Sequence, residues 1–349
     1  MRSGPWLPFI VTAAFSTLGF YWLLYRKRQV RIPTKWKQVG KVEKIVMYPL
    51  KSGALRPLSE AKCTETGLVE FDNEKRRSFH DRSFVIYNLE LKPLRLFVNK
   101  AAVTISVESV DLDTVLFKAP HMSPIFLKFS SFSSAPCKVQ LSNYGSIMEV
   151  IDCGDKISEW LSQYLLATKD GFRLGYYEQN LCRRRGAIEI MRNDSPKLLS
   201  VYEARDNDSG ALSDLASYMV ISAETIDDVN AKLPVEDRFE LGNLRPNIVV
   251  RGCDKYAEDS WTWMKIGNQV VMKAFKPCTR CLIITINPNT GEGNKNQQPF
   301  KLLKTYRTVK HLKGHDVEGS SPVLGTYLGL YVPGNIRLGD PVYIDSAEK

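Results

Sequence analysis

Apolar residues gather in short runs along the chain, a pattern that predicts many strands and few helices. The runs lie at residues 44–48, 83–87, 94–98, 103–107, 172–177, 248–251 and 282–286. In the run at 103–107, apolar and polar positions alternate, as in a strand with one buried face. Many short strands with few helices favour β-barrel-like modules over a doubly wound parallel sheet. The expected fold class is therefore mostly β with α (α+β).

Two segments have helical periodicity instead. The first begins at Asp155, and its apolar residues are Ile157, Trp160, Leu161, Tyr164 and Leu165. This spacing predicts one buried helix face, which is typical of core packing and not of a cofactor site. In the second segment, Ser222 is in the capping position and Pro234 ends the helix.

The apolar stretch at the amino terminus is the longest in the chain. Residues 6–25 carry no charge, and Arg26, Lys27 and Arg28 follow directly. Twenty helical residues rise about 30 Å, enough to cross the hydrocarbon core of a bilayer. A cleaved signal peptide is the competing interpretation, but its apolar region is usually shorter. We predict an uncleaved signal-anchor over residues 1–28, with a transmembrane helix at 6–25 and, by the positive-inside tendency, a cytosolic remainder.

Composition divides the rest of the chain into a linker and two domains. Residues 29–39 are rich in Lys, Arg and Pro, which predicts a basic linker. Residues 40–168 are expected to form a mostly β domain, and residues 190–346 a second domain that carries the cysteine motif described below. A chain of 349 residues with 44% hydrophobic content is long enough for two such cores.

Charge limits the classes of expected partner, and cysteine content indicates the redox compartment. The net charge of +10 suits an anionic cofactor, an acidic protein or a membrane surface. The basic residues are dispersed or in short clusters, as at 75–77 and 183–185, without interleaved aromatic residues, so no nucleic-acid partner is expected. Seven irregularly spaced cysteines do not resemble a disulfide framework, which indicates a reducing compartment.

The candidate chemistry centres on Cys278 and Cys281, which follow Pro277 with Arg280 between them. The run at 282–286 is expected to be a strand, so both thiols would lie at its entry. A neighbouring guanidinium lowers the pKa of a thiol, and the thiolate is a good nucleophile or soft-metal ligand. Three alternatives are buried apolar cysteines, a dithiol redox pair, or a zinc site completed by His311 and His315.

A second candidate is the turn that follows the run at 44–48. Lys51 and Ser52 precede Gly53 there, and an ammonium beside a hydroxyl at a glycine turn suits a phosphate or an oxo-anion. Many surface turns share this composition, so the motif is weak when taken alone. No P-loop, dinucleotide-binding glycine motif or serine-nucleophile elbow is present.

Six motifs in this order, together with the predicted anchor, resemble those of one family. They are Tyr48-Pro49-Leu50-Lys51-Ser52, Asp81-Arg82, Leu244-Arg245-Pro246-Asn247-Ile248-Val249, Tyr256-Ala257-Glu258-Asp259-Ser260-Trp261, Cys278-Thr279-Arg280-Cys281 and Gly339-Asp340-Pro341-Val342-Tyr343. The chain resembles the MOSC-domain proteins, and specifically the membrane-anchored amidoxime-reducing components of the mitochondrial outer membrane. The resemblance implies an N-terminal MOSC-associated β domain over residues 40–168, followed by a MOSC β-barrel-like domain over residues 190–346.

The resemblance also implies a molybdenum cofactor, a pterin dithiolene with a terminal phosphate. Cys281 would be the metal ligand and catalytic residue, with Cys278 as its neighbour. The implied cofactor-binding residues are Lys51, Ser52, Arg82, Asp214, Leu215, Arg245, Asn247, Thr279, Arg280, Cys281 and Tyr327. Leu215 departs from the family pattern, which has a polar residue there, so any contact would come from its backbone.

The implied activity is reduction of N-hydroxylated compounds, namely amidoximes, hydroxylamines and N-hydroxyguanidines, to amines or amidines. The resemblance implies electrons from NADH through cytochrome b5 reductase and cytochrome b5, and the chain itself contains no nicotinamide, flavin or haem motif. The implied location is the mitochondrial outer membrane, with the catalytic domain facing the cytosol. The alternatives are a molybdenum-cofactor carrier or sulfur-transfer (sulfurase-like) MOSC protein, and a membrane-tethered zinc or scaffold module.

Overall fold

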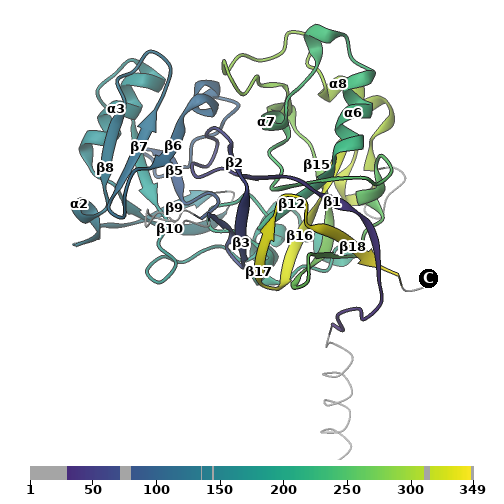
Figure 1. The fold of residues 1–349 in the computed structure, drawn as a ribbon. Helices are drawn as coiled ribbons and strands as arrows, with labels where there is room; N and C mark the ends of the chain where they lie inside the picture. Colours follow the sequence, from purple (N-terminus) through teal and green to yellow (C-terminus); the bar gives the residue numbers. More distant parts are fainter. Residues whose placement is uncertain (1–29, 71–79, 135, 144, 310–314, 347–349) are drawn as a thin grey trace, which may run out of the picture.

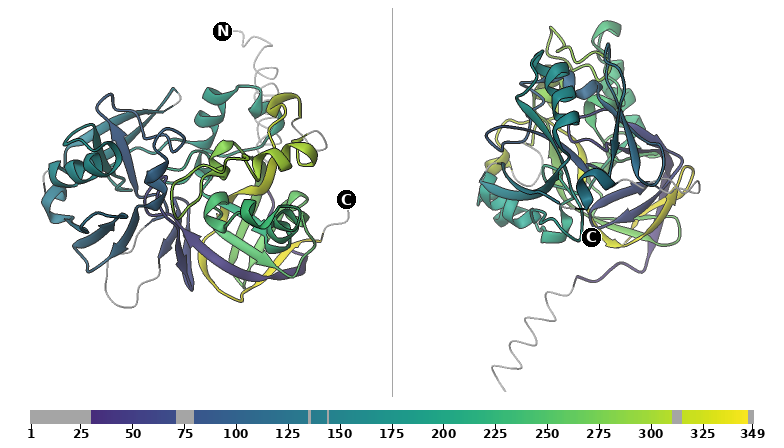
Figure 2. Two further views of the ribbon diagram at one scale, coloured as in Figure 1. Left: turned by 90° about the horizontal axis from the view of Figure 1, so that it is seen from above. Right: turned by 90° about the vertical axis from the view of Figure 1, so that its left-hand side faces the viewer.

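The computed structural model describes residues 30–70, 80–134, 136–143, 145–309 and 315–346. They form a mostly β protein with helices, arranged in two lobes that lie side by side in Figure 1 and in the view from above in Figure 2. The predicted transmembrane helix at 6–25 lies outside the described residues. Within them, no helix is both long and apolar enough to cross a membrane.

The first lobe contains two antiparallel sheets, the short helix α2 (Ser130–Ser133) and one longer helix. One sheet has the order β5 (Phe84–Asn88), β11 (Phe172–Tyr176), β10 (Ser146–Asp152) and β9 (Lys138–Asn143); the other has β6 (Ser106–Ser109), β7 (Thr114–Lys118) and β8 (Ile125–Lys128). The longer helix, α3 (Asp155–Leu166), buries Ile157, Trp160 and Leu161, which confirms the predicted core-facing stripe. An aromatic cluster that includes Phe84 and Phe117, with ring centroids 5.4 Å apart, fills the core between these elements.

The second lobe is a closed barrel. Its strands follow the order β13 (Ile248–Arg251), β12 (Tyr218–Ser222), β16 (Val323–Val332), β15 (Val270–Thr279), β14 (Trp263–Ile266), β18 (Pro341–Asp345) and β1 (Trp36–Met47). The first half of β1 pairs with β18 and the second half with β13, so β1 closes the ring. Closure removes the free sheet edges, and the barrel prediction for this part of the chain is confirmed.

Shorter elements complete the second lobe. Strand β2 (Arg56–Leu58) extends β1, and β3 (Glu60–Thr64) pairs with β4 (Gly67–Glu70) and β17 (Gly334–Arg337). The helices α6 (Ala223–Ala231), α7 (Leu241–Leu244) and α8 (Phe300–Tyr306) lie together at one end of the barrel in Figure 1. Ser222 accepts a hydrogen bond from the Thr225 amide at 3.1 Å, which confirms the predicted cap of α6.

Two segments predicted as strands have other structures, and a third is a strand only in part. Residues 282–286 fall in a 3-10 helix, η5 (Leu282–Thr285), and residues 94–98 form a turn that exposes Phe97 and Val98. Residues 103–107 are divided between η1 (Lys100–Thr104) and β6. A short apolar run can contribute to a core in several conformations, and periodicity alone does not distinguish a strand from the others.

Strand β1 also begins earlier than expected. Its first residue, Trp36, lies inside the predicted linker at 29–39 and pairs with Asp345 near the end of the chain. The strand therefore joins the start of the described chain to the barrel of the second lobe.

We expect β1 to be essential for barrel stability. Ile45 is fully buried in the barrel core and pairs with Ile248 of β13, so Ile45→Ala should lower the free energy of unfolding by about 2–5 kcal/mol. The neighbouring Lys44 is exposed, and Lys44→Ala should change it by less than about 0.5 kcal/mol. Equal effects of the two substitutions in chemical denaturation would contradict the role assigned to β1.

Candidate functional site

A cleft of about 890 Å³ lies between the two lobes, and residues from both of them line it. The first lobe contributes the turn at 93–98 together with Asn143 and Ser146. All eleven residues predicted as cofactor contacts line this one cleft: Lys51, Ser52, Arg82, Asp214, Leu215, Arg245, Asn247, Thr279, Arg280, Cys281 and Tyr327. Their roles toward a cofactor stay predictions, but segments far apart in the sequence meet here.

Lys51 reaches the cleft from the turn that follows β1. Its amide donates to the Phe84 carbonyl at 2.7 Å, which fixes the turn against the first lobe. Its ammonium, only 9% exposed, donates to the Leu212 carbonyl at 3.0 Å and forms an ion pair with Asp214. Burial lowers the pKa of Lys51, and Asp214 opposes this shift.

Asp214 is the acidic partner of Lys51 in the cleft. Its side chain is 78% exposed in the cleft and bonds to Lys51. Desolvation raises the pKa of Asp214, but the charges of Lys51, Arg185 and Arg82 outweigh that effect and lower it to about 2. The carboxylate is therefore ionised at any physiological pH.

A buried carboxylate, Asp81, connects three segments of the cleft wall. Asp81 is 3% exposed and accepts hydrogen bonds from the Tyr48 amide at 2.7 Å and from Asn247 Nδ2 at 3.1 Å. It also accepts from Arg82 in an ion pair. Asn247 adds a bond from its Nδ2 to the Val46 carbonyl at 3.3 Å. Asn247 therefore links Asp81 to the end of β1 in the cleft wall.

Arg245 presents an unsatisfied donor. Its guanidinium lies 4.1 Å from the centre of the Tyr48 ring, and Nη1 donates to the Gly53 carbonyl at 2.7 Å. Its Nη2 is buried and has no hydrogen-bond partner within the described part of the chain. Burial lowers the pKa of Arg245 to about 10. An unpaired buried donor costs about 1–3 kcal/mol, so this atom suits an anionic or oxygen-bearing ligand.

Three cleft residues have left-handed backbone conformations without being glycine. The φ angles of Ser52, Arg82 and Arg245 are 71°, 56° and 55°. Such conformations cost of order 1 kcal/mol each, and surrounding contacts have to hold them. Arg82 is held by its ion pair with Asp81 and by its amide bond to the Tyr48 carbonyl at 2.7 Å, and Arg245 by its bond to the Gly53 carbonyl.

The two cysteines occupy different environments. Strand β15 ends at Thr279, and Cys281 is the cap residue before η5, so the thiols lie at the exit of a strand and not at the entry of one. Cys281 is exposed on the cleft wall. Cys278 is 2% exposed and packs in a core cluster with Met219 and Leu324. Both cysteines border the cleft, but Cys281 is the exposed one of the two.

Arg280 lowers the pKa of the Cys281 thiol, as predicted, but a larger effect of the surroundings outweighs it. The Arg280 guanidinium donates to the Leu324 carbonyl at 2.8 Å and to the Leu244 carbonyl at 2.7 Å, so it braces the cleft wall. Desolvation raises the pKa of Cys281, and the charge of Arg280 only partly opposes this. The ligand-free thiol is therefore protonated at neutral pH.

Leu215 and Tyr327 line the cleft and also pack against hydrophobic side chains behind it. Leu215 packs against Met191, Leu198 and Tyr202, and its side chain has a packing role that a polar residue would not fill. Tyr327 of β16 stacks on Phe275 with ring centroids 6.3 Å apart. Burial raises the pKa of Tyr327.

Sequence reasoning missed five charged residues of the cleft, namely Arg95, Arg185, Asp194, Lys276 and Glu318. Lys276 is 5% exposed and forms an ion pair with Glu318. Arg185 belongs to the basic cluster at 183–185, and sequence gives no sign of which of these arginines turns inward. Lys276 and Glu318 are too far apart in the chain for any motif to connect them.

Among the residues that the structure describes, no group of three or more His, Cys, Asp and Glu side chains is placed to hold a metal ion. His311 of the predicted zinc set lies outside those residues. The zinc alternative therefore stays a prediction.

The comparisons with known proteins agree with this architecture. Residues 207–343 match the family model of the MOSC domain, and residues 39–168 match that of the MOSC N-terminal beta barrel domain. Among solved structures, YiiM from Geobacillus stearothermophilus is 15% identical with a TM-score of 0.25 over 37% of this chain and 53% of that chain, too distant to inform the fold.

Curated relatives indicate which group of MOSC-domain proteins the chain resembles. The chain is 32% identical to mitochondrial amidoxime-reducing component 1 of Mus musculus, over 92% of this chain and 86% of that protein. It is 32% identical to component 1 of Homo sapiens, over 88% and 84%, and 29% identical to human component 2, over 97% and 94%. The chain therefore belongs to the MOSC-domain family of amidoxime-reducing components.

The environment of Cys281 predicts a distinctive reactivity. Because the surrounding cleft walls desolvate the accessible thiol of Cys281 and raise its pKa, its alkylation by iodoacetamide should be slow at pH 7 and should accelerate with a midpoint above the ordinary thiol pKa of about 8.5. Peptide mass spectrometry of the ligand-free protein measures this rate, and buried Cys278 should react far more slowly at every pH. A midpoint below about 8 would show an activated thiolate and contradict the assignment.

Proposed function

We propose that the protein is a molybdenum-cofactor-dependent reductase that converts N-hydroxylated compounds, such as amidoximes, hydroxylamines and N-hydroxyguanidines, to amines or amidines. The relatives are named for amidoxime reduction. The observation that carries the proposal is one exposed thiol, Cys281, on the wall of a cleft lined by seven cationic and three acidic side chains. A soft ligand beside a cationic surface suits a metal held by an anionic organic group.

The residues present fit the proposed cofactor. Arg245 has a buried N–H donor without a partner, and Lys51 and Arg82 add charge beside it. When bound, the cofactor supplies the redox chemistry that removes the oxygen of an N–OH group. Cys281 would provide a thiolate ligand. Its raised pKa means that a proton must leave the thiol when the metal binds.

The outer wall of the cleft suits organic substrates. Leu94 and Leu96 are buried in the turn at 93–98, whereas Phe97 and Val98 are 54% and 75% exposed beside them. Apolar walls with a few polar groups are typical of small-molecule sites. The polar part of the cleft would hold the cofactor, and this apolar part would contact the body of the substrate.

Electrons would come from NADH through cytochrome b5 reductase and cytochrome b5. The positive net charge of +10 favours encounter with an acidic cytochrome. The mitochondrial names of the relatives and the uncharged stretch at 6–25 support a location in the mitochondrial outer membrane, with the catalytic domain facing the cytosol. A cofactor carrier or sulfur-transfer protein is the alternative, since an exposed thiol in such a cleft would also serve those roles.

Metal and pterin content test the proposal directly. The purified protein should contain molybdenum and pterin at close to one per chain. Cys281→Ser should reduce the bound molybdenum at least about tenfold, because it removes the thiolate ligand. Cys278→Ser is the matched control and should keep the metal, since that thiol is buried in the core.

An assay of amidoxime reduction distinguishes the reductase from the carrier, sulfur-transfer and zinc alternatives. Benzamidoxime reduction with NADH, cytochrome b5 reductase and cytochrome b5 by the cofactor-loaded protein supports the reductase. Stoichiometric pterin without any reduction supports a carrier or sulfur-transfer role. Zinc without pterin, lost equally from both serine variants, would refute the proposal and favour a zinc module.

Salt dependence tests the partner. Raising ionic strength from about 0.01 M to 0.15 M shortens the Debye length from about 30 Å to 8 Å, so turnover with cytochrome b5 should fall severalfold. Turnover driven by dithionite should change much less, because that route needs no protein encounter. Equal salt sensitivity of both routes would argue against electrostatic docking.

A further inference from the structure

The beginning of the described chain carries exposed cations that lie outside the cleft. Arg31, Lys35 and Lys37 are exposed, and the sequence has no acidic residue before Glu43. Within the described part of the chain, these three side chains form no ion pair and no hydrogen bond. Their charge is therefore available to a partner outside the chain.

The barrel adds two aromatic rings and a further cation beside this segment. Alternate residues of β14 and β18 are buried in the barrel core, so Lys265 and Tyr343 lie on its outer surface. The Lys265 ammonium lies 6.0 Å from the centre of the Trp36 ring of β1 and 5.6 Å from that of the Tyr343 ring. All three side chains are partly exposed. We call this surface the β1 face, and its residues are Arg31, Lys35, Trp36, Lys37, Lys265 and Tyr343.

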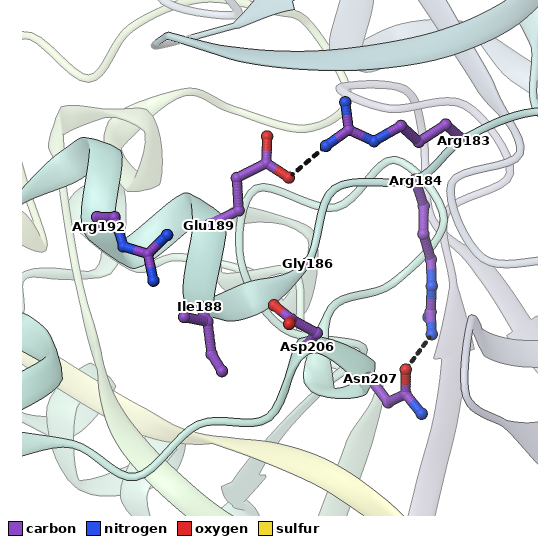
Figure 3. A pocket seen from close by; sticks show the side chains of 8 residues that line it. All are labelled: Arg183, Arg184, Gly186, Ile188, Glu189, Arg192, Asp206 and Asn207. Atoms are coloured by element: carbon purple, nitrogen blue, oxygen red, sulfur yellow. Dashed lines mark hydrogen bonds and ion pairs between the residues drawn. The ribbon is translucent and has the colours of Figure 1, made fainter.

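The basic cluster at 183–185 provides a contrast, because carboxylates accompany it. Figure 3 shows Arg183 bonded to Glu189, at 3.0 Å, beside a pocket of about 330 Å³ at α4 (Ala187–Asp194). Asp206 lines the same pocket. Internal carboxylates therefore offset much of the positive charge around this pocket.

The β1 face has far less internal compensation. Among the residues that pair with it in the sheet, only Asp345 is acidic. Asp345 pairs with Trp36, and its Oδ1 accepts a hydrogen bond from the Trp263 amide at 3.2 Å. One carboxylate beside four cations leaves the face with a net positive charge.

The face lies close to the predicted membrane anchor. The uncharged stretch at 6–25 ends five residues before Val30. Val30 and Ile32 are 46% and 39% exposed and add apolar surface next to the cations. In Figure 1 the described chain begins below the barrel, on the side opposite α6, α7 and α8. Phe300 of α8 lines the cleft, so a bilayer against the β1 face would leave that part of the cleft in water.

We propose that the β1 face lies on the bilayer surface and binds the headgroups of anionic phospholipids. Trp and Tyr rings favour the interface between lipid and water, and each Lys or Arg near an anionic leaflet strengthens the attraction. The contact fixes the orientation of the barrel, so the two lobes do not turn freely on the anchor. The inference rests on the proposed function only for the anchor at 6–25 and does not involve the cofactor.

Lysine footprinting of the full-length chain tests this contact. The chain is placed in lipid nanodiscs of phosphatidylcholine alone, or of equal parts of phosphatidylcholine and phosphatidylserine. It is then acylated with acetic anhydride and analysed by peptide mass spectrometry. Lys265 should react at least about threefold more slowly in the anionic discs, because headgroups cover the outer surface of β14. Lys169, exposed in the first lobe, is the internal control and should react equally in both.

Salt dependence and the wild-type rates decide whether the protection is electrostatic. At about 1 M salt the Debye length is about 3 Å, so the difference between the two kinds of disc should disappear. Equal acylation of Lys265 in both kinds of disc at low salt overturns the inference.

Charge reversal identifies the groups that hold the face on the lipid. Lys35→Glu combined with Lys37→Glu should abolish the protection of Lys265, although the reporter lysine itself is unchanged. Lys128→Glu combined with Lys156→Glu makes the same change of charge on exposed residues of the first lobe and should leave the protection intact. Protection that survives in the first variant contradicts the role of these cations.

An acidic protein is the competing occupant of the face. The soluble domain of cytochrome b5 is added to the chain in phosphatidylcholine discs. If it protects Lys265 and anionic lipid does not, the face is a protein-docking surface and the inference is overturned.

Flotation with vesicles of the same two compositions separates the inference from the anchor. Failure of the wild type to float with phosphatidylcholine vesicles would contradict the anchor. The inference would still stand if the wild type floats with the anionic vesicles and the variant carrying Lys35→Glu and Lys37→Glu does not. Failure to float with either kind of vesicle overturns both.

Discussion

The geometry of the cleft wall depends on the hydrogen bonds of one carboxylate, that of Asp81. It is buried, and it is bonded to the Tyr48 amide, to the Asn247 amide and to Arg82. A buried charge must be fully hydrogen-bonded to be tolerated, so the three segments that supply these donors cannot shift independently. Each segment also brings a cation to the cleft: Lys51 after the first, Arg82 in the second and Arg245 in the third. One acidic side chain thus fixes the spacing of the cationic wall.

The same network explains why strained backbone persists in this region. Ser52, Arg82 and Arg245 have positive φ angles that a free chain would rarely adopt. The segments that contain them are tied to Asp81 or to the Gly53 carbonyl, which compensates for the strain. The wall is therefore organised before any ligand arrives, and preorganisation reduces the ordering that binding would otherwise require.

Much of the fold and the membership of the cleft could be predicted from the sequence, because motif order places Lys51, Arg82, Arg245 and Cys281 together. The parts that failed depend on tertiary contacts. The run at 282–286 is as apolar as a strand, but the Ile284 amide bonds to the Cys281 carbonyl and so forms a 3-10 turn. Arg280 stands beside Cys281 in sequence, yet its guanidinium turns toward backbone carbonyls. Arg185 could not be distinguished from its two neighbours, because only the packing of the lobes decides which of them is enclosed.

Closure of the barrel by β1 has a consequence for how the chain is made. Trp36 pairs with Asp345, so the first strand has to wait for a partner that is synthesised much later. Most of the core of the first lobe comes from residues 84–182, so this lobe can fold earlier, whereas the barrel stays open until β18 has been made. Contacts between residues so far apart in the sequence slow folding, and strand edges stay exposed until those contacts form. The second lobe is consequently the part of the molecule in which strand edges stay unpaired longest during synthesis.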